Sequence, residues 1–484
     1  MRIINKIIIS VVLFAICFSF STVVYANENQ DYVFNVQKGE AVAVPSSMMQ
    51  THIIDSVGNI PLNSPQDIVA CNQKLFVLDS LNSRVIIFDS QYNEVFTFAS
   101  VNKSGEQLTF KDAQGIFATE DNRIYIADTE NNRILISDFK GNYIKEFKDT
   151  EYIKKLSSKF VFKPQKIVVD NSKRMFIINQ GTYEGLLCIS ADGEFEGFIG
   201  ANKVIPTLWE LFWKTFSTKA QQEAMVQFVP VEFSGVAIDR DGFLYSTAKG
   251  ENGNQMIRKF NMNGVDILRF DKSNPLQGDL EEIVAASLDK KKSNFIDVAL
   301  RASGVYTCLD NTRGRLFTYN HNGELLFAMG GLSNQKGSFS NPGAVEWFGD
   351  ELVVADRGTN KIVIFSPTDY GKVLLCGVDN QFAGNYNEAT EDYYILNKYN
   401  SNSEIAYKGI AKSLFKEGKY KEAMVYAQLG NDTDLYSKAF DMQRQSFMAQ
   451  VIPILLIVII AVAVVSVIFS SVKTIKRIKR KYED

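Results

Sequence analysis

Residues 124–136 read Ile-Tyr-Ile-Ala-Asp-Thr-Glu-Asn-Asn-Arg-Ile-Leu-Ile. They contain an apolar strand that ends in Asp, a polar turn, an Arg five residues after the Asp, and a second apolar strand. The same sequence motif occurs at residues 75–88, again with Arg, and at residues 352–365, with Lys in place of Arg. Self-similarity at a period of about 45–50 residues predicts a β-propeller built from four-stranded blades.

Six segments of the chain begin with a turn and continue as a short alternating strand, as the first strand of a blade would. These segments start at Ser64, Asp112, Lys163, Phe233, Phe295 and Asn341. We therefore expect a mainly β fold with six blades within residues 27–375. Residues 31–55 are expected to add a strand to the last blade, because closure of the ring removes exposed sheet edges.

The strand, Asp, turn and base pattern resembles the NHL-repeat family, which implies a six-bladed propeller of the NHL or TolB-like class. The resemblance covers roughly residues 50–370. It rests on four pairs, which are Asp79/Arg84, Asp128/Arg133, Asp310/Arg315 and Asp356/Lys361. The third blade departs from the pattern with Asn179 and no matching base, and the fourth departs with Ser246-Thr247-Ala248.

These Asp/base pairs could bind a ligand or hold the scaffold together. An Asp at a strand end can accept backbone N–H bonds from the following turn. The base five positions later can pair with that Asp or with the next blade. A ligand site rarely needs four identical copies, so we interpret the four pairs as structural.

Residues 205–228 interrupt the series of blade repeats with a helix-like segment that contains two of the three tryptophans. Its apolar residues recur at helical spacing. This insertion could pack on the rim of the propeller as extra core, or it could contact a partner or a membrane. The candidate partner-binding residues are Trp209, Phe212, Trp213 and Phe216. A second, shorter helix is expected over Asn274–Leu288.

Beyond residue 380 the apolar spacing changes from that of a strand to that of a helix. Residues 385–389, Asn-Tyr-Asn-Glu-Ala, return 34 residues later as Lys-Tyr-Lys-Glu-Ala at residues 419–423. This pattern resembles the tetratricopeptide repeat over residues 383–448, because that repeat has the same period. A plain helical stalk is the alternative.

Residues 1–26 resemble a secretory signal peptide. Arg2 and Lys6 form a charged start, residues 7–20 are apolar, and Ala26 is a plausible cleavage position. An uncleaved N-terminal anchor is the alternative. Either way, the segment implies that the chain crosses a membrane during its export.

Residues 451–472 contain no charged side chain. A helix of this length spans about 33 Å, enough for a hydrocarbon core of about 30 Å, so one membrane-spanning helix is expected. Residues 473–484 carry six basic and two acidic side chains, which predicts a cytoplasmic tail. Residues 27–450 are then expected on the extracytoplasmic side of a cell membrane.

Several classes of chemistry are disfavoured. The chain has two histidines, His52 and His321, so a zinc site built from three histidines is excluded. No nucleotide-binding loop or GxSxG motif occurs. We expect no metal and no cofactor. The formal net charge of −3 includes a basic tail, so the remainder is distinctly acidic and argues against nucleic acid as a partner.

Two functions stay open. The first is a membrane-anchored extracytoplasmic binding or scaffold protein that contacts other membrane or extracytoplasmic proteins. The second is a hydrolase of the calcium-dependent lactonase type, which would gather carboxylates and a divalent cation at the propeller axis. An enzyme is the less favoured of the two. Acidic or amide side chains around a metal at the axis would support the second.

Overall fold

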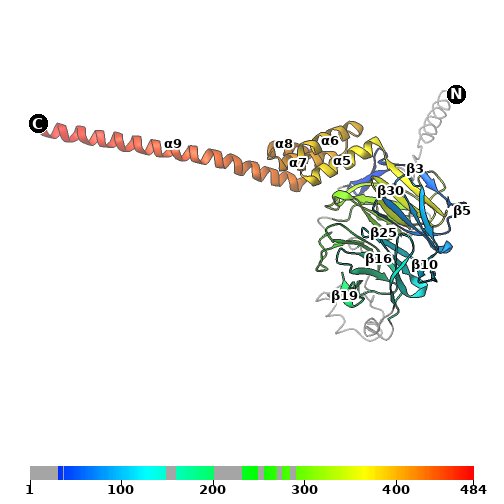
Figure 1. Ribbon diagram of the computed structural model, residues 1–484. Helices are drawn as coiled ribbons and strands as arrows, with labels where there is room; N and C mark the ends of the chain where they lie inside the picture. Colours follow the sequence, from blue (N-terminus) through cyan, green and yellow to red (C-terminus); the bar gives the residue numbers. More distant parts are fainter. Residues whose placement is uncertain are drawn as a thin grey trace, which may run out of the picture. The chain divides into compact units, whose positions relative to one another are not determined.

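The protein is represented by a computed structural model, which describes residues 31–35, 38–148, 160–200, 232–248, 256–268, 270, 275–283 and 290–483 (Figure 1). The chain divides after Thr368 into two units, each described here by itself. The expected signal peptide, residues 1–26, and the aromatic insertion with Trp209, Phe212, Trp213 and Phe216 lie outside the described residues.

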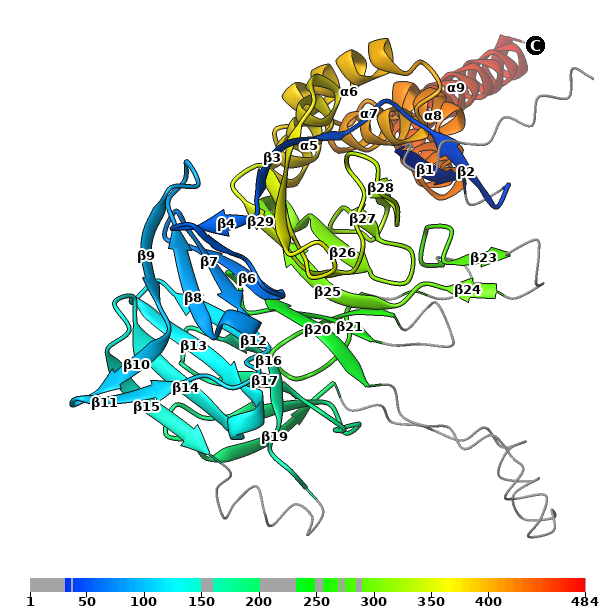
Figure 2. The ribbon, with the colours of Figure 1, turned by 90° about the vertical axis from the view of Figure 1, so that its right-hand side faces the viewer.

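The first unit is a six-bladed β-propeller, as predicted (Figure 2). The first blade contains β6 (Pro65–Cys71), β7 (Lys74–Asp79), β8 (Arg84–Phe88) and β9 (Glu94–Phe98). The second contains β12 (Gly115–Thr119), β13 (Arg123–Asp128), β14 (Arg133–Asp138) and β15 (Tyr143–Lys148). The third contains β16 (Pro164–Val169), β17 (Met175–Asn179), β18 (Leu186–Ile189) and β19 (Phe195–Ile199).

The other three blades follow in chain order. The described part of the fourth contains β20 (Phe233–Ile238), β21 (Leu244–Ala248) and β22 (Ile257–Phe260). The fifth contains β25 (Phe295–Leu300), β26 (Tyr306–Asp310), β27 (Arg315–Tyr319) and β28 (Leu325–Gly330). The sixth contains β29 (Pro342–Phe348), β30 (Glu351–Asp356), β31 (Lys361–Pro367) and the N-terminal strand β3 (Met48–Ile54).

The strand β3 closes the ring, because it pairs antiparallel with β31 from Met48↔Pro367 to Ile54↔Ile362. The predicted closing strand is therefore confirmed. No pairing with another blade was predicted for the segment that precedes β3. There, β1 (Tyr32–Asn35) and β2 (Glu40–Ala43) form a hairpin that joins β28 through Tyr32↔Ala328, so the fifth blade gains two outer strands.

The core lies between neighbouring blades. In β7, Phe76 packs in a cluster with Ile126 of the second blade, whereas Leu75 packs in a cluster with Val353 of the sixth. Successive side chains of a strand point to opposite faces, so a strand covered on both faces is apolar throughout. This explains why β7 and β13 contain continuous apolar runs.

Short hairpins connect the blades. These are β4 (Ser56–Val57) with β5 (Ile60–Pro61), β10 (Ser100–Lys103) with β11 (Glu106–Thr109), and β23 (Glu281–Ile283) with β24 (Lys290–Lys292). The last pair corrects the short helix expected over Asn274–Leu288, since the described residues 281–283 form a strand. A helical apolar spacing over so few residues does not exclude an extended hairpin.

The second unit contains five helices in its described residues. They are α5 (Asp369–Ala383), α6 (Tyr386–Tyr399), α7 (Glu404–Lys416), α8 (Tyr420–Leu429) and α9 (Thr433–Glu483). Consecutive helices pack side by side. Tyr393 of α6 lies against two glycines: an added Cβ would come within 3.1 Å of its ring at Gly377 and within 2.4 Å at Gly409. Small residues therefore let α5 and α7 approach α6 closely.

The helix α9 is one continuous element that includes the predicted membrane span. Its residues Thr433–Ile478 are long and apolar enough to cross a membrane, with a window of mean hydropathy 3.4. Pro453 lies inside α9 and does not interrupt it. A proline removes one backbone donor, and helices that cross membranes tolerate this loss.

Candidate functional site

The first strands of the six blades lie next to one another around the propeller axis (Figure 2). Five of them contain a bulge near their start, where one residue has no partner on the second strand. The register shifts lie between Pro65 and Asp67, Pro164 and Lys166, Phe233 and Gly235, Phe295 and Asp297, and Pro342 and Ala344. Bulges re-aim the side chains beside them, and they are frequent next to functional sites.

At one equivalent position of the six first strands, which follows the bulge in five of them, charged and small residues alternate around the ring. In blade order the residues are Asp67, Gly115, Lys166, Gly235, Asp297 and Ala344. The Nζ atom of Lys166 lies 2.5 Å from Oδ1 of Asp67 and 3.1 Å from Oδ1 of Asp297. We call these three residues the axial triad. It joins the first, third and fifth blades.

The remaining carboxylate oxygens of the triad bond to neighbouring blades. The backbone N–H of Ile116 donates to Oδ2 of Asp67 at 2.9 Å, and that of Val345 donates to Oδ2 of Asp297 at 3.0 Å. Glycine lets the fourth blade approach the fifth closely, because an added Cβ at Gly235 would lie 2.6 Å from the Cα of Asp297. The axis is therefore held by buried, charge-assisted bonds.

The electrostatics of the axis follow from burial. Burial raises the pKa of Asp67 to about 6, and the charge of Lys166 opposes this increase. Burial also lowers the pKa of Lys166, but the two carboxylates outweigh it and raise that pKa above its ordinary value. Nearby Glu346 has a pKa well above its ordinary value because of burial and the charge of Asp297.

The residues at the axis do not fit a divalent cation. Calcium takes six to eight oxygen ligands, whereas the ammonium of Lys166 lies between the two carboxylates of the triad. Each carboxylate has its other oxygen bonded to a backbone N–H. Within the described parts of the chain, no three His, Cys, Asp or Glu side chains come together to hold a metal ion.

A second ring of side chains lies one residue before the six positions at which charged and small residues alternate. Its members are half-buried, and one comes from each blade: Gln66, Gln114, Gln165, Ser234, Ile296 and, over Gly343 in the sixth blade, Arg357. We call this ring the axial entrance. Gln165 donates to Gln114 at 3.1 Å, and Nη1 of Arg357 donates to Oε1 of Gln66 at 3.4 Å. Amide and guanidinium groups can hydrogen-bond a ligand.

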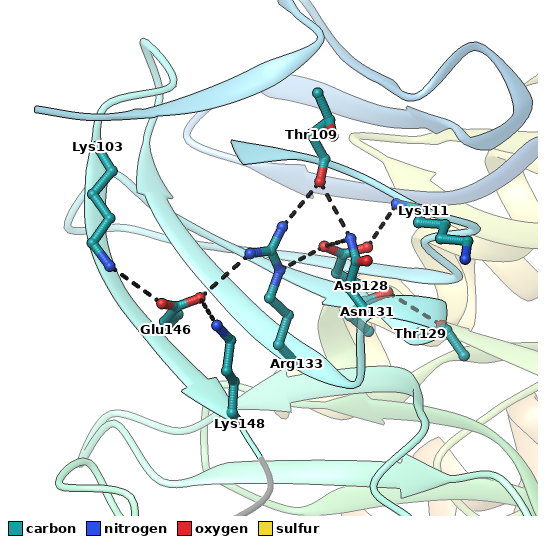
Figure 3. Close-up of polar contacts among 10 residues, drawn as sticks. Lys103, Thr109, Lys111, Asp128, Thr129, Asn131, Arg133, Glu146 and Lys148 are labelled. Carbon is teal, nitrogen blue, oxygen red and sulfur yellow. Dashed lines mark hydrogen bonds and ion pairs between the residues drawn. The ribbon is translucent and has the colours of Figure 1, made fainter. Parts of the chain in front are cut away.

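The predicted Asp/base pair of the second blade is a buried network (Figure 3). Oδ1 of Asp128 accepts from the backbone N–H of Lys111 at 2.8 Å, and Oδ2 accepts from Nε of Arg133 at 2.7 Å. The side-chain amide of Asn131 also donates to Oδ2, at 2.8 Å. Nη2 of Arg133 donates to the carbonyl of Thr109 at 2.9 Å. The pair thus ties one hairpin to the segment that enters the blade.

The first blade repeats this arrangement, and the third blade has Asn179 in place of the Asp. Asp79 accepts from the backbone N–H of Asn63 at 2.8 Å and from Nε of Arg84 at 2.7 Å. In the third blade Oδ1 of Asn179 accepts from the backbone N–H of Lys163 at 2.6 Å. In these two blades the backbone donor precedes the blade. Asn179 therefore serves as the same acceptor without a base. The turn after the Asp, which was expected to donate, does so in the fifth and sixth blades through the N–H groups of Thr312 and Gly358.

The fifth blade distributes its bases differently. Asp310 accepts from the backbone N–H of Asn294 at 2.9 Å and from Nε of Arg313 at 3.1 Å. Arg315 donates instead to Oδ2 of Asp279 at 2.9 Å. The base that bonds Asp310 is Arg313, three residues after it, so a spacing of five residues did not identify this base.

In the sixth blade the Asp is held mostly by backbone groups. Asp356 accepts from the backbone N–H groups of Ser340 at 2.9 Å and Asn341 at 2.8 Å, and Lys361 is its partner in the strand register. Across these blades the Asp or Asn accepts from the segment that enters the blade, and the base varies. The structural role of the four pairs stays a prediction.

Neither the axial triad nor the axial entrance was predicted from the sequence. The six blade starts identified there contain all of these residues except Arg357. The one sign of the triad in the sequence is that charged and small residues alternate at the same position of successive blades. A partner-binding role for Trp209, Phe212, Trp213 and Phe216 stays a prediction.

No protein-family model matches the sequence, and no curated protein matches it. Among solved structures, the virginiamycin B lyase from Staphylococcus aureus is 11% identical, with a TM-score of 0.40, and the match covers 65% of this chain and 98% of that chain. A streptogramin B lyase is 11% identical with a TM-score of 0.41, over 67% of this chain and 100% of that one. A protein of unknown function from Bacteroides caccae is 10% identical with a TM-score of 0.35, over 66% and 94%.

Proposed function

We propose that this protein is a membrane-anchored binding or scaffold protein that presents its propeller and its helices to other proteins on the extracytoplasmic side of a cell membrane. The observation that carries the proposal is the axial triad. Lys166 bonds both carboxylates and so fixes three blades relative to one another. A fixed axis suits a rigid platform for binding.

The alternative, a hydrolase of the calcium-dependent lactonase type, has less support. Such an enzyme needs oxygen ligands that are open to a cation and to a substrate. At this axis the carboxylates of Asp67 and Asp297 are engaged by an ammonium and by backbone N–H groups. We therefore favour binding over hydrolysis.

The membrane part of the proposal rests on α9 and its flanks. An apolar stretch followed at once by basic side chains favours a cytoplasmic C-terminus, so residues 473–484 would form the cytoplasmic tail. The resemblance to a signal peptide at residues 1–26 supports the same topology. Residues 27–450 would then lie outside the cytoplasm.

The finer family assignments are also proposals. The repeated Asp at the end of the second strand supports the NHL-repeat assignment of the propeller. The helices α6 and α8 both begin with Tyr, at Tyr386 and Tyr420, and this offset of 34 residues supports the tetratricopeptide assignment. Helical repeats would offer a second surface for partner proteins.

Cysteine labelling tests the topology. Cys376 is exposed on α5, so a membrane-impermeant maleimide should label it in intact cells from which the wall has been removed. Cys376→Ser should lose most of this labelling. Adding Thr474→Cys to that variant should restore labelling only after the membrane is permeabilised. Labelling of Thr474→Cys in intact cells would contradict the proposed topology.

Co-purification tests the binding role. The full chain, solubilised in detergent and captured through a tag, should retain specific membrane or extracytoplasmic proteins that mass spectrometry identifies. An unrelated single-pass protein with the same tag controls for micelle effects. Capture of the same proteins by both chains would contradict the scaffold role.

A further inference from the structure

Arg357 departs from the residues at the same position of other blades. It follows directly after the strand-end Asp of the sixth blade, where the first blade has Ser80 and the second has Thr129. Those hydroxyls bond to the start of the next blade: Ser80 donates to the carbonyl of Ala113 at 2.8 Å, and Thr129 donates to that of Pro164 at 2.7 Å. In the sixth blade a long, charged side chain replaces this small contact between blades.

The backbone is shaped to admit Arg357. Its side chain crosses the bulge residue Gly343, where an added Cβ would lie 2.6 Å from Nε, 2.9 Å from Cδ and 3.1 Å from Cγ. Gly343 is not among the glycines with a positive φ, so its backbone conformation does not require glycine. The absence of a side chain at Gly343 therefore provides space for Arg357 to reach the axial entrance.

The guanidinium of Arg357 lacks a carboxylate partner among the described residues. Its one side-chain hydrogen bond there is the 3.4 Å contact with Gln66, and its Nε is buried with no acceptor. The adjacent Asp356 is engaged by the backbone N–H groups of Ser340, Asn341 and Gly358. Burial lowers the pKa of Arg357, which the charges of Asp356 and Asp297 oppose, but a guanidinium stays protonated. A half-buried cation without a carboxylate partner favours an anionic ligand.

We propose that the axial entrance binds a single carboxylate of a partner protein, with Arg357 as its anchor and the amides of Gln66, Gln114 and Gln165 as further hydrogen-bond groups. This inference rests on the proposed function, since it names the chemistry that the partner would offer. Arg is well suited to hold a carboxylate through two parallel N–H bonds. A singly charged group fits better than a dianion, because the axial triad has two carboxylates for one ammonium and the charge of Asp297 acts on Arg357.

Three matched pentapeptides provide the probe. One ends in a free carboxylate, one has the same sequence with an amidated end and no acidic side chain, and one is amidated with a central Glu. Binding to the full chain in detergent is measured by isothermal titration calorimetry. The neutral peptide should not bind. Binding of the first or third peptide identifies a terminal or a side-chain carboxylate as the recognised group.

Three variants locate the site. Arg357→Gln should weaken binding about tenfold or more, the usual effect of losing a hydrogen bond to a charged group. Lys361→Gln removes a base from the same blade and should leave affinity unchanged. Gly343→Ala keeps Arg357 but forces its flexible side chain aside, so affinity should fall while the melting temperature stays near that of the wild type.

The inference is overturned if no carboxylate peptide binds, if Arg357→Gln binds as the wild type does, or if Lys361→Gln loses as much affinity. Co-purification separates its failure from that of the proposed function. Proteins that co-purify while no peptide binds would sink the inference alone. Peptides that bind through Arg357 while no protein co-purifies would leave the inference standing and count against the proposed scaffold role.

Discussion

Replacement of Asp128 by Ala is the most direct test of the structural role of the Asp/base pairs. The carboxylate is fully buried and accepts bonds from Lys111, Asn131 and Arg133. The side chain of Ala accepts none of them. Arg133, itself 7% exposed, keeps its bonds to Thr109 and to Glu146 but loses its shortest contact.

The magnitude follows from this inventory. Breaking a buried ion pair by removal of one partner typically costs about 3–5 kcal/mol, since the other charge stays buried. For large domains each kcal/mol lowers the melting temperature by about 2 °C, so a decrease of roughly 6–10 °C is expected. The double variant Asp128→Ala/Arg133→Met should recover part of this loss, because it removes the buried guanidinium that has lost its closest carboxylate.

The assay is thermal unfolding of the full chain in detergent, followed by the near-ultraviolet circular dichroism of its aromatic residues. Asp138→Ala, in the exposed turn of the same blade, is the matched control. Asp138 accepts from the backbone N–H groups of Lys140 and Asn142, and its loss should cost about 1 kcal/mol. If Asp128→Ala melts like this control, or if the double variant is no more stable than the single one, the network does not stabilise the blade.

Three further variants test other parts of the chain. Lys166→Met should destabilise the propeller by about 3–5 kcal/mol at pH 7.5, with partial recovery at pH 5 as Asp67 binds a proton; unfolding in urea at both pH values measures this, and equal losses would contradict it. Burial raises the pKa of Asp31 from 3.8 to about 7, so the folded state binds this proton more tightly than the unfolded state, and stability should fall as pH rises from about 4 to about 7. Asp31→Asn should remove that part of the pH dependence, about 4 kcal/mol at most, in urea titrations across this range; an unchanged profile would refute the assignment. Gly409→Ala places a methyl group 2.4 Å from the ring of Tyr393 and should destabilise the helical unit by about 1–3 kcal/mol, seen in the melting of the helical circular dichroism signal. A melting curve like that of the wild type would mean that α6 and α7 are not closely packed there.

The fold could be predicted because the phrase around Asp128 repeats with its strands, its turn and its period together. Each copy indicates the same hairpin, and six blade starts define the number of blades. Closure by β3 could be predicted because an open ring would expose two sheet edges. The hairpin of β1 and β2 could not, since a short strand pattern does not specify which of several blade edges it joins.

The axial triad could not be predicted from the same residues. Lys166 lies 99 residues from Asp67 and 131 residues from Asp297 in the sequence. Their convergence depends on bulges that shift the register by one position. A strand pattern read without these bulges points alternate side chains to the wrong face. The position of Arg357 was even harder to predict, because its side chain lies over Gly343 in a space that only the assembled blade defines.

The continuity of α9 makes rotation about its axis a controllable quantity. No loop separates the residues that follow Thr433 from the candidate membrane span that begins near residue 451, so the two ends of the helix rotate together. Each residue of an α-helix advances by about 100° and 1.5 Å. A single inserted alanine in this stretch would therefore turn the helices packed on its first part by more than a quarter turn relative to the candidate span. Two insertions would turn them by about 200°, and about seven would return them to their starting direction, roughly 10 Å farther from that span.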